Sequence, residues 1–302
     1  MRPTPMVEMT MPGVRLFAKL EYLNPVGSIK DRTTYWILRQ AIARGDIDEQ
    51  TTVIESSSGN FAVALATYSQ LLGLQFIPVI DPNILPTYES FLRRMCPVVL
   101  KVEEADESGG FLQARLRAVE DLRANTEKAY WTNQYANTDG MDAHYQQTAA
   151  EICHDLSALN YAFIGVSSGG TIAGMSRRLK EHFPTVKVIA VDAAGSAIFG
   201  GAPRKRHIPG LGAGIVPPLL QHAEIDDVAI VTEQTTARAC RDLLWDHGLF
   251  VGGSSGTSFA AVQQYAEVMR ATPSPTALFL CGDRGTAYLD TVFNAEWTTR
   301  LE

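Results

Sequence analysis

Several features that define common protein classes are missing from this chain of 302 residues. No apolar run approaches the roughly 18 residues that a membrane-spanning helix needs, and the start lacks the apolar core of a signal peptide. The four cysteines form no CxxC pair, and the six histidines form no HxxxH or HExxH pattern. We therefore expect a cytoplasmic protein without a structural metal.

Excess positive charge is also absent, because 33 acidic residues outnumber 26 lysines and arginines and give a formal net charge of −7. A nucleic-acid partner favours a basic surface, so this balance argues against one. Hydrophobic residues make up 46% of the chain and charged residues 20%, which is ordinary for a globular protein and sufficient for a sizeable core. We expect a small-molecule partner, for which local charge matters more than net charge.

The hydrophobic pattern predicts strands that alternate with helices. Strands are expected at residues 15–21, 51–55, 74–80, 98–102, 161–166, 186–191 and 277–280, and helices at 31–44, 61–68, 109–125, 172–182, 235–247 and 256–271. Apolar strands covered on both faces are typical of α/β proteins with mainly parallel sheets. We expect two such sheets in two lobes, a smaller mobile lobe at residues 24–137 and a larger lobe at 1–23 plus 138–302.

Lys30 lies at a predicted junction between a turn and a helix. The preceding residues 24–28 read Asn-Pro-Val-Gly-Ser, which favours a turn, and Asp31 suits the first turn of a helix. A lysine whose surroundings lower its pKa is neutral and nucleophilic, and can anchor a cofactor covalently. The alternative, an ordinary solvated lysine, is the commoner case for a lone lysine.

Two serine- and glycine-rich loops follow predicted strands and precede predicted helices. In a parallel sheet they lie at the carboxyl ends of the strands, where ligands bind. Residues 56–60 (Ser-Ser-Ser-Gly-Asn) offer hydroxyl, amide and backbone N–H donors that suit a carboxylate, although a serine-rich helix cap is an equal alternative. Residues 167–171 (Ser-Ser-Gly-Gly-Thr) suit a small phosphate monoester, since they match neither a Walker loop nor GxGxxG.

A third loop of this kind, residues 252–257, precedes the last long helix and suits a flat cofactor, although a flexible turn with a helix cap is a strong alternative. One carboxylate-binding loop, one phosphate-binding loop and a lysine at a junction together indicate a pyridoxal-phosphate enzyme that acts on an amino acid.

Four sequence motifs together resemble those of a known enzyme family. Residues 24–32, 55–60, 167–171 and 207–214 are similar, in this order, to the cysteine synthase group of fold-type II pyridoxal-phosphate enzymes, whose α/β fold is tryptophan synthase β-like. The resemblance implies that Lys30 is the Schiff-base lysine and that Asn60 contacts the cofactor's ring hydroxyl. It further implies a phosphate site at Ser167, Ser168, Gly169, Gly170 and Thr171, and a substrate-carboxylate site at Ser57, Ser58, Gly59 and Gln134.

Within this family, residues 109–112, 130–137 and 191–200 resemble members that use an amino-acid amine as nucleophile. This implies O-phospho-L-serine and L-glutamate as substrates, a product used for 2,3-diaminopropionate and siderophore biosynthesis, and a homodimer. It also implies substrate contacts at Arg115, Tyr135, Ser167 and Gly212, although a helical arginine is more often a surface residue.

Two other functions stay open: a cysteine synthase that combines O-acetylserine or O-phosphoserine with sulfide, and a non-enzymatic regulatory relative that holds the cofactor. The sequence also departs from the family pattern. Phe61 replaces a usual threonine, which we expect to reshape the carboxylate side of the pocket. The stretch 281–285 lacks the usual serine, so Ser254 becomes the candidate for the pyridine nitrogen, with Asp283 as its competitor.

Overall fold

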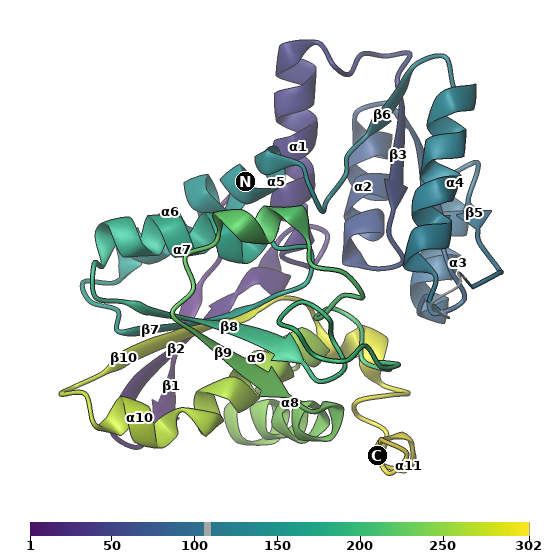
Figure 1. Cartoon of the computed structure of the whole chain (residues 1–302). Coiled ribbons are helices and arrows are strands. Elements are labelled where there is room, and N and C mark those ends of the chain that lie inside the picture. Colours follow the sequence, from purple (N-terminus) through teal and green to yellow (C-terminus); the bar gives the residue numbers. More distant parts are fainter. Residues whose placement is uncertain (106–109, 302) are drawn as a thin grey trace. The chain divides into compact units, whose positions relative to one another are not determined.

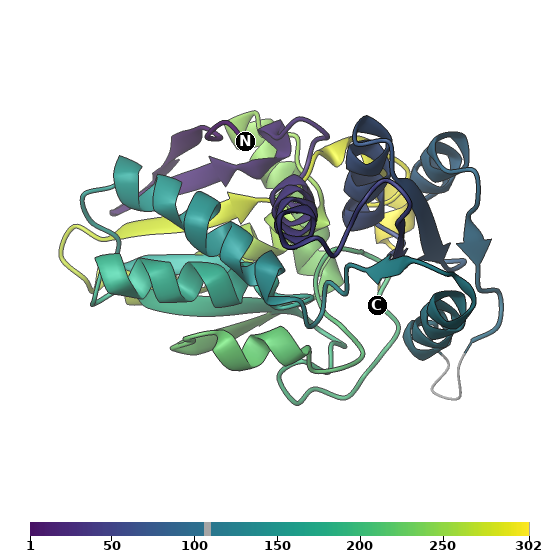
Figure 2. The ribbon, with the colours of Figure 1, turned by 90° about the horizontal axis from the view of Figure 1, so that it is seen from above.

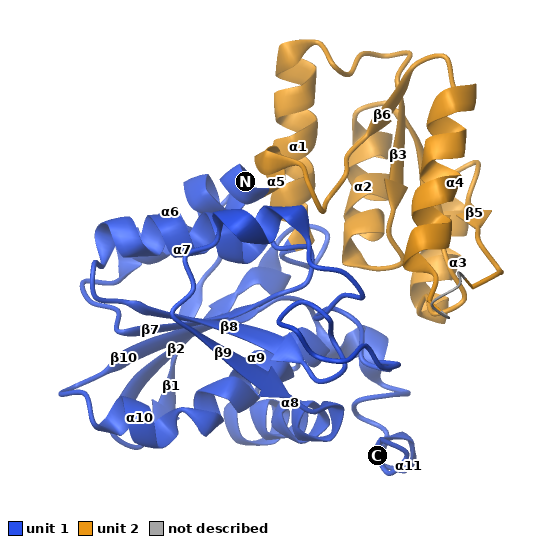
Figure 3. Ribbon diagram, viewed as in Figure 1, with its two compact units in different colours: residues 1–29, 141–302 blue, residues 30–140 orange. Residues whose placement is uncertain are grey.

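The computed structural model describes residues 1–105 and 110–301. It divides into two compact units (Figure 3). Unit 1 comprises Met1–Ile29 with Met141–Glu302, and unit 2 comprises Lys30–Gly140. Each unit has its own sheet flanked by helices, so the predicted α/β class with two mainly parallel sheets is confirmed.

Unit 1 is built on a six-stranded sheet (Figure 1). Its strand order is β1 (Met6–Met11), β2 (Val14–Leu20), β10 (Thr276–Cys281), β7 (Tyr161–Gly165), β8 (Lys187–Ala193) and β9 (Asp227–Val231). Among the described strands of this sheet, only β1 runs antiparallel to its neighbour. Parallel neighbours need crossover helices, and these carry their apolar sides onto both faces of the sheet.

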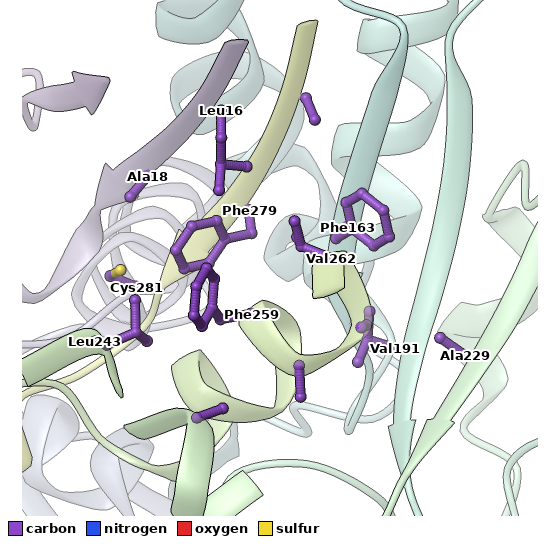
Figure 4. Packing of buried hydrophobic residues seen from close by; sticks show 14 of the residues in the cluster. Leu16, Ala18, Phe163, Val191, Ala229, Leu243, Phe259, Val262, Phe279 and Cys281 are labelled. Carbon is purple, nitrogen blue, oxygen red and sulfur yellow. The ribbon is translucent and has the colours of Figure 1, made fainter. Parts of the chain in front are cut away.

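Helices cover both faces of this sheet, as the turned view also shows (Figure 2). One apolar cluster joins the sheet to α8 (Glu233–His247), α9 (Gly253–Gln264) and α10 (Ala266–Arg270), and Phe163, Phe259 and Phe279 contribute their rings to it (Figure 4). A second cluster joins the other face to α6 (Ala149–Asp155) and α7 (Gly170–His182). The remaining short segments of unit 1 are the 3₁₀ turns Glu21–Leu23, Pro218–His222 and Gly285–Tyr288, the π-helical turn His144–Thr148, and α11 (Ala295–Thr298).

Unit 2 contains a four-stranded sheet in which all described strands are parallel. The order is β5 (Leu100–Lys101), β4 (Gln75–Ile80), β3 (Thr52–Ser56) and β6 (Ala129–Trp131). Residues of α1 (Lys30–Arg44), α2 (Asn60–Leu71) and α3 (Pro86–Met95) form one apolar cluster with the sheet, and α4 (Leu112–Asn125) forms another. α5 (Thr138–Ala143) carries the chain back to unit 1.

The structure corrects several predicted elements. The leading segment forms strand β1, and β6, β9, α3 and the helical stretch 138–155 were not predicted. The predicted helix 256–271 is two helices, which meet at Tyr265, and the predicted strand 98–102 shrinks to two residues. The predicted helix 109–125 begins at Leu112, and residue 109 lies outside the described residues. No described helix is both long and apolar enough to cross a membrane.

Candidate functional site

Lys30 is the first residue of α1, as the turn-and-helix pattern predicts. Gly27 has a φ of 109°, which favours glycine, and the Ile29 amide donates to the carbonyl of Gly282 at 2.8 Å. The chain just before the lysine is therefore fixed to the end of β10. Lys30 is partly exposed by area, yet burial around its amine lowers its pKa to about 8. A substantial neutral fraction near physiological pH distinguishes it from an ordinary solvated lysine.

In unit 2, the predicted carboxylate loop connects β3 to α2. The Ser57 amide donates to Val79 on the neighbouring strand at 3.1 Å, and the Gly59 amide donates to the Ser57 hydroxyl at 3.4 Å. Asn60 then begins α2, so this loop leads directly into the N-terminal turn of a helix. Its Oδ1 accepts a hydrogen bond from the Tyr88 hydroxyl at 2.7 Å. The free N–H groups and positive dipole end of such a turn favour an anion.

Arg115 belongs to this loop rather than to the outer surface. Its Nε lies 3.2 Å from an oxygen of Asp81, and its guanidinium donates to the Ser58 hydroxyl at 3.1 Å. Only 12% of the Arg115 side chain and 7% of the Asp81 side chain are exposed. The surface alternative for Arg115 is therefore wrong. Asp81, which directly follows β4, supplies the carboxylate that holds the guanidinium.

Gln134 is joined to the same loop by two hydrogen bonds. Its side-chain amide donates to the carbonyl of Ser56 at 3.2 Å, and its backbone amide donates to the Glu55 carboxylate at 3.3 Å. The Thr132 hydroxyl donates to the same Glu55 oxygen at 2.5 Å. The chain turns sharply at Asn133, with a φ of 46°, and this places Gln134 beside the loop. Tyr135, the next predicted substrate residue, is half-buried.

Phe61, which replaces the family's usual threonine, lies in the core of unit 2, and its effect on the carboxylate side of the pocket stays a prediction. Its side chain is 2% exposed and packs in the apolar cluster of unit 2 with Leu65 and Ile80. The second residue of α2 points into the core because the helix must bury one face against the sheet.

In unit 1, the predicted phosphate loop connects β7 to α7. Gly169 has a φ of 87°, and a Cβ there would lie 3.0 Å from the Leu220 amide nitrogen, so the position requires glycine. Ser167 donates to the carbonyl of Gly212 at 3.4 Å, which joins two predicted site residues. Gly170 and Thr171 begin α7, and Ser168 is buried. A glycine-rich loop that opens into a long helix is a suitable phosphate site.

His144, which sequence reasoning missed, supports this loop from behind. Its Nε2 lies 3.2 Å from the Thr171 hydroxyl, and its Nδ1 lies 3.0 Å from the Thr148 hydroxyl. His144 is buried and begins the π-helical turn. Neither a lone histidine nor the π-helical turn leaves a recognisable sequence signal. Asp81 and Tyr88 also leave no local sequence signal, because each acts through a partner that is distant in the sequence.

The two candidates for the pyridine nitrogen lie near each other in unit 1 but differ in their partners. Asp283 is buried and accepts a hydrogen bond from the Tyr288 hydroxyl at 2.6 Å. Ser254 is half-buried in the first turn of α9, and a Cβ on Gly282 would lie 3.1 Å from its hydroxyl oxygen. Tyr288 occupies only one oxygen of Asp283, so the assignment of Ser254 to the pyridine nitrogen stays a prediction, with Asp283 as its competitor.

These features fit pyridoxal phosphate. Unit 2 begins with a lysine of lowered pKa and holds a serine-rich loop at a helix start, and unit 1 holds a glycine-dependent loop at a helix start. Across residues 1–105 and 110–301, no group of three or more histidine, cysteine and acidic side chains could bind a metal. The fit therefore rests on an amine for the cofactor's aldehyde and on hydrogen-bond donors for a phosphate and a carboxylate.

Comparison with known proteins gives the class. The sequence model of the pyridoxal-phosphate dependent enzyme family matches residues 1–282, and the chain belongs to this family. Its cofactor is pyridoxal 5′-phosphate.

One relative in the comparison carries the name of a specific enzyme. The chain is 43% identical over 291 residues to N-(2-amino-2-carboxyethyl)-L-glutamate synthase of Cupriavidus metallidurans, and the match covers 95% of this chain and 84% of that protein. The resemblance inferred from the motifs is thereby confirmed.

Solved structures agree on the fold. An O-acetylserine-dependent cystathionine β-synthase from Helicobacter pylori superposes with a TM-score of 0.89 at 30% identity, covering 95% of this chain and 94% of that one. An O-ureido-L-serine synthase mutant with its ligand bound superposes with a TM-score of 0.88 at 25% identity, covering 97% and 91%. The predicted fold-type II architecture is confirmed.

Proposed function

We propose that this enzyme replaces the phosphate of O-phospho-L-serine with the amino group of L-glutamate. The products are N-(2-amino-2-carboxyethyl)-L-glutamate and phosphate, and the first serves 2,3-diaminopropionate and siderophore biosynthesis. The observation that carries the proposal is the 43% identity, over 95% of the chain, to a synthase named for this product. The hydrogen bond from Arg115 to Ser58 supports it, because it holds a cation beside the carboxylate loop. A second amino-acid substrate brings additional carboxylates that a guanidinium can bind.

The carboxylate loop of unit 2 binds the α-carboxylate of O-phospho-L-serine. Its donors are the hydroxyls of Ser57 and Ser58, the backbone N–H of Gly59 and the side-chain amide of Gln134. Hydrogen bonds and the helix dipole hold the anion without a direct lysine contact. Tyr135 and Arg115 receive glutamate, and Ser167 and Gly212 complete the substrate contacts.

Lys30 anchors the cofactor and moves the proton. Bound pyridoxal phosphate withdraws electrons from the substrate Cα, so that its proton leaves more easily and the β-phosphate can depart. The amine of Lys30 removes the Cα proton and later returns it, a role that a pKa of about 8 suits. Asn60 binds the ring hydroxyl, the loop of Ser167–Thr171 binds the phosphate, and Ser254 presents a neutral hydroxyl to the pyridine nitrogen.

The direct test is mass spectrometry of the products. The purified enzyme is incubated with O-phospho-L-serine and either L-glutamate or sulfide in parallel. We expect a glutamate adduct with stoichiometric phosphate release. Cysteine as the only product would instead assign the chain to the cysteine synthases. Retention of cofactor without turnover of either pair would favour a regulatory relative.

We further propose a cytoplasmic homodimer in which unit 2, residues 30–140, forms the mobile lobe, in place of the 24–137 expected from the sequence. Closure of that lobe would exclude water from the reacting carbon. Light scattering measures the molar mass and so tests the dimer. Limited proteolysis with and without O-phospho-L-serine tests whether the substrate changes the mobility of this lobe.

A further inference from the structure

We propose that Glu55 takes up a proton when a substrate carboxylate binds to residues 57–60. The substrate anion and the proton then bind together, and the charge of this end of the site stays balanced. The inference rests on the proposed role of this loop in binding the substrate's α-carboxylate.

Glu55 is placed for such coupling by its position and its hydrogen bonds. It lies in β3, two residues before Ser57, and its side chain is fully buried. The Thr132 hydroxyl and the Gln134 backbone amide both donate to Oε2. Among the described residues, Oε1 has no hydrogen-bond partner. A proton on Oε1 therefore leaves both existing hydrogen bonds in place.

The carboxyl also titrates in the relevant range. Burial raises the pKa of Glu55 to about 7, and the polar groups of Thr132, Gln134, Ser56 and Trp131 offset only part of this effect. Near neutral pH the group is thus poised between its two charge states. A modest change in the local field is enough to protonate it.

Charged groups on neighbouring elements do not compensate Glu55. β3 packs against β4, β6, α2 and α4. The ionisable residues on these elements are Tyr68 on α2, Tyr130 on β6, and Arg115, Arg117, Glu120, Asp121 and Arg123 on α4. None of them contributes to the pKa shift of Glu55. Arg115, whose guanidinium contacts Ser58 of the loop, is already paired with Asp81, which follows β4.

A substrate carboxylate therefore adds a negative charge next to a buried carboxyl that, among the residues the structure describes, has no cationic partner. Two carboxylates in one poorly solvated site oppose each other's ionisation, so the pKa of Glu55 rises when the loop is occupied. By linkage, carboxylate affinity is highest when Glu55 is protonated and falls as pH rises through about 7.

A purely structural role predicts something different. Glu55 also connects β3 to the turn that carries Gln134. If this were its only function, neutralising it would weaken the connecting hydrogen bonds and reduce carboxylate affinity at every pH.

The experiment measures the affinity of the cofactor-loaded enzyme for L-serine between pH 6 and 8, from the change in cofactor absorbance. L-Serine carries the α-carboxylate but no phosphate to titrate. Both proteins share the pH dependence that comes from deprotonating the serine amine, so the affinity of the unmodified enzyme is compared with that of Glu55→Gln at each pH. We expect this ratio to fall by up to about tenfold across the range, because Glu55→Gln is neutral throughout. At pH 8 the affinity of Glu55→Gln should exceed that of the unmodified enzyme.

Two controls separate the contributions. Ethanolamine keeps the amine and hydroxyl but lacks the carboxylate, so its binding should not distinguish Glu55→Gln from the unmodified enzyme. Thr132→Val removes a donor that favours the ionised form. It should raise the pKa of Glu55 and extend tight L-serine binding to higher pH.

Weaker binding of L-serine by Glu55→Gln at both ends of the range would overturn the inference, as would equal pH dependence in the two proteins. Absence of L-serine binding at any pH would overturn the carboxylate-loop assignment as well. Failure of the glutamate product assay with normal L-serine coupling would count only against the proposed nucleophile.

Discussion

Burial changes the pKa of two groups, Lys30 and Glu55, in opposite directions. It lowers the pKa of the lysine to about 8 and raises that of the glutamate to about 7. The cause is the same for both, because a poorly solvated environment disfavours whichever form is charged. Both groups consequently change protonation near neutral pH, where most lysines and glutamates do not.

Replacing the lysine tests its covalent and proton-transfer roles together. We expect Lys30→Ala to lose the Schiff-base absorbance and to lower turnover by at least about a thousandfold, since both cofactor anchor and base disappear. Lys128→Ala, an exposed lysine of unit 2 paired with Asp48, is the matched control and should remain active. Retained turnover in Lys30→Ala would disprove the assignment.

Neutralising Glu55 should also change stability in a pH-dependent way. The pKa of about 7 in the folded protein exceeds the ordinary value of 4.5, so the unmodified protein loses stability as pH rises from about 4.5 through about 7. Glu55→Gln does not ionise and avoids that loss. We expect its Tm, measured by calorimetry on apo-protein, to gain on the unmodified protein between pH 5 and pH 8. An equal Tm difference at both pH values would contradict the burial argument.

At the scale of elements, the proposed anion sites use helix starts in both units. α2 begins at Asn60 after the carboxylate loop, and α7 begins at Gly170 after the phosphate loop. Each helix directly follows a parallel strand, so each loop lies at the carboxyl end of its sheet. The backbone supplies N–H donors at these points, which explains why small residues dominate both loops.

Gly169→Ala tests the backbone geometry of the phosphate loop. A left-handed φ of 87° and a contact of 3.0 Å to Leu220 should cost about 1–2 kcal/mol and shift the start of α7. We expect lower Tm and weaker binding of pyridoxal phosphate to apo-protein. Gly248→Ala, at the end of α8, has a φ of 68° but open space around a Cβ. It should lower stability while cofactor affinity stays unchanged. Equal cofactor affinities in the two variants would count against the phosphate loop.

Arg115→Ala tests the link between α4 and the loop. Removing the guanidinium leaves Asp81 buried without its cation, which should reduce the free energy of unfolding by about 2–3 kcal/mol. Arg117→Ala, an exposed arginine on the same helix, should change it by less than about 0.5 kcal/mol. Urea denaturation measures both. Equal small effects would show that the pair with Asp81 contributes little.

At the scale of the whole molecule, each unit has its own sheet and apolar clusters. Unit 2 is one continuous segment, Lys30–Gly140, whereas unit 1 combines two segments of the chain. A continuous segment of domain size with its own core can fold alone. We expect isolated residues 30–140 to show a cooperative thermal transition by circular dichroism and dispersed amide NMR signals. A molten, non-cooperative fragment would show that its core depends on unit 1.

Much of the fold could be predicted from the hydrophobic pattern, because buried parallel strands such as β7 and β10 are nearly continuous apolar runs. Short or partly exposed elements were not predicted. β9 has alternating exposure, β6 spans only three residues, and the amphipathic α3 begins at Pro86 within a stretch that resembles a loop. Pairing with neighbours, rather than local sequence, makes these segments regular.

The sequence by itself determined the parts of the site that lie on single loops. Lys30 with its turn, the loop 56–60 and the loop 167–171 are each a contiguous motif, and their order along the chain identifies the family.

Only the tertiary structure decided the partners that hold these loops. Asp81 binds Arg115, Glu55 binds Thr132, and His144 contacts Thr171, each across many residues of sequence. Local patterns encode backbone conformation, whereas hydrogen bonds between separate strands and helices depend on how the chain folds. The pKa of Glu55 follows from the same cause, because no residue next to it in sequence determines how deeply it is buried.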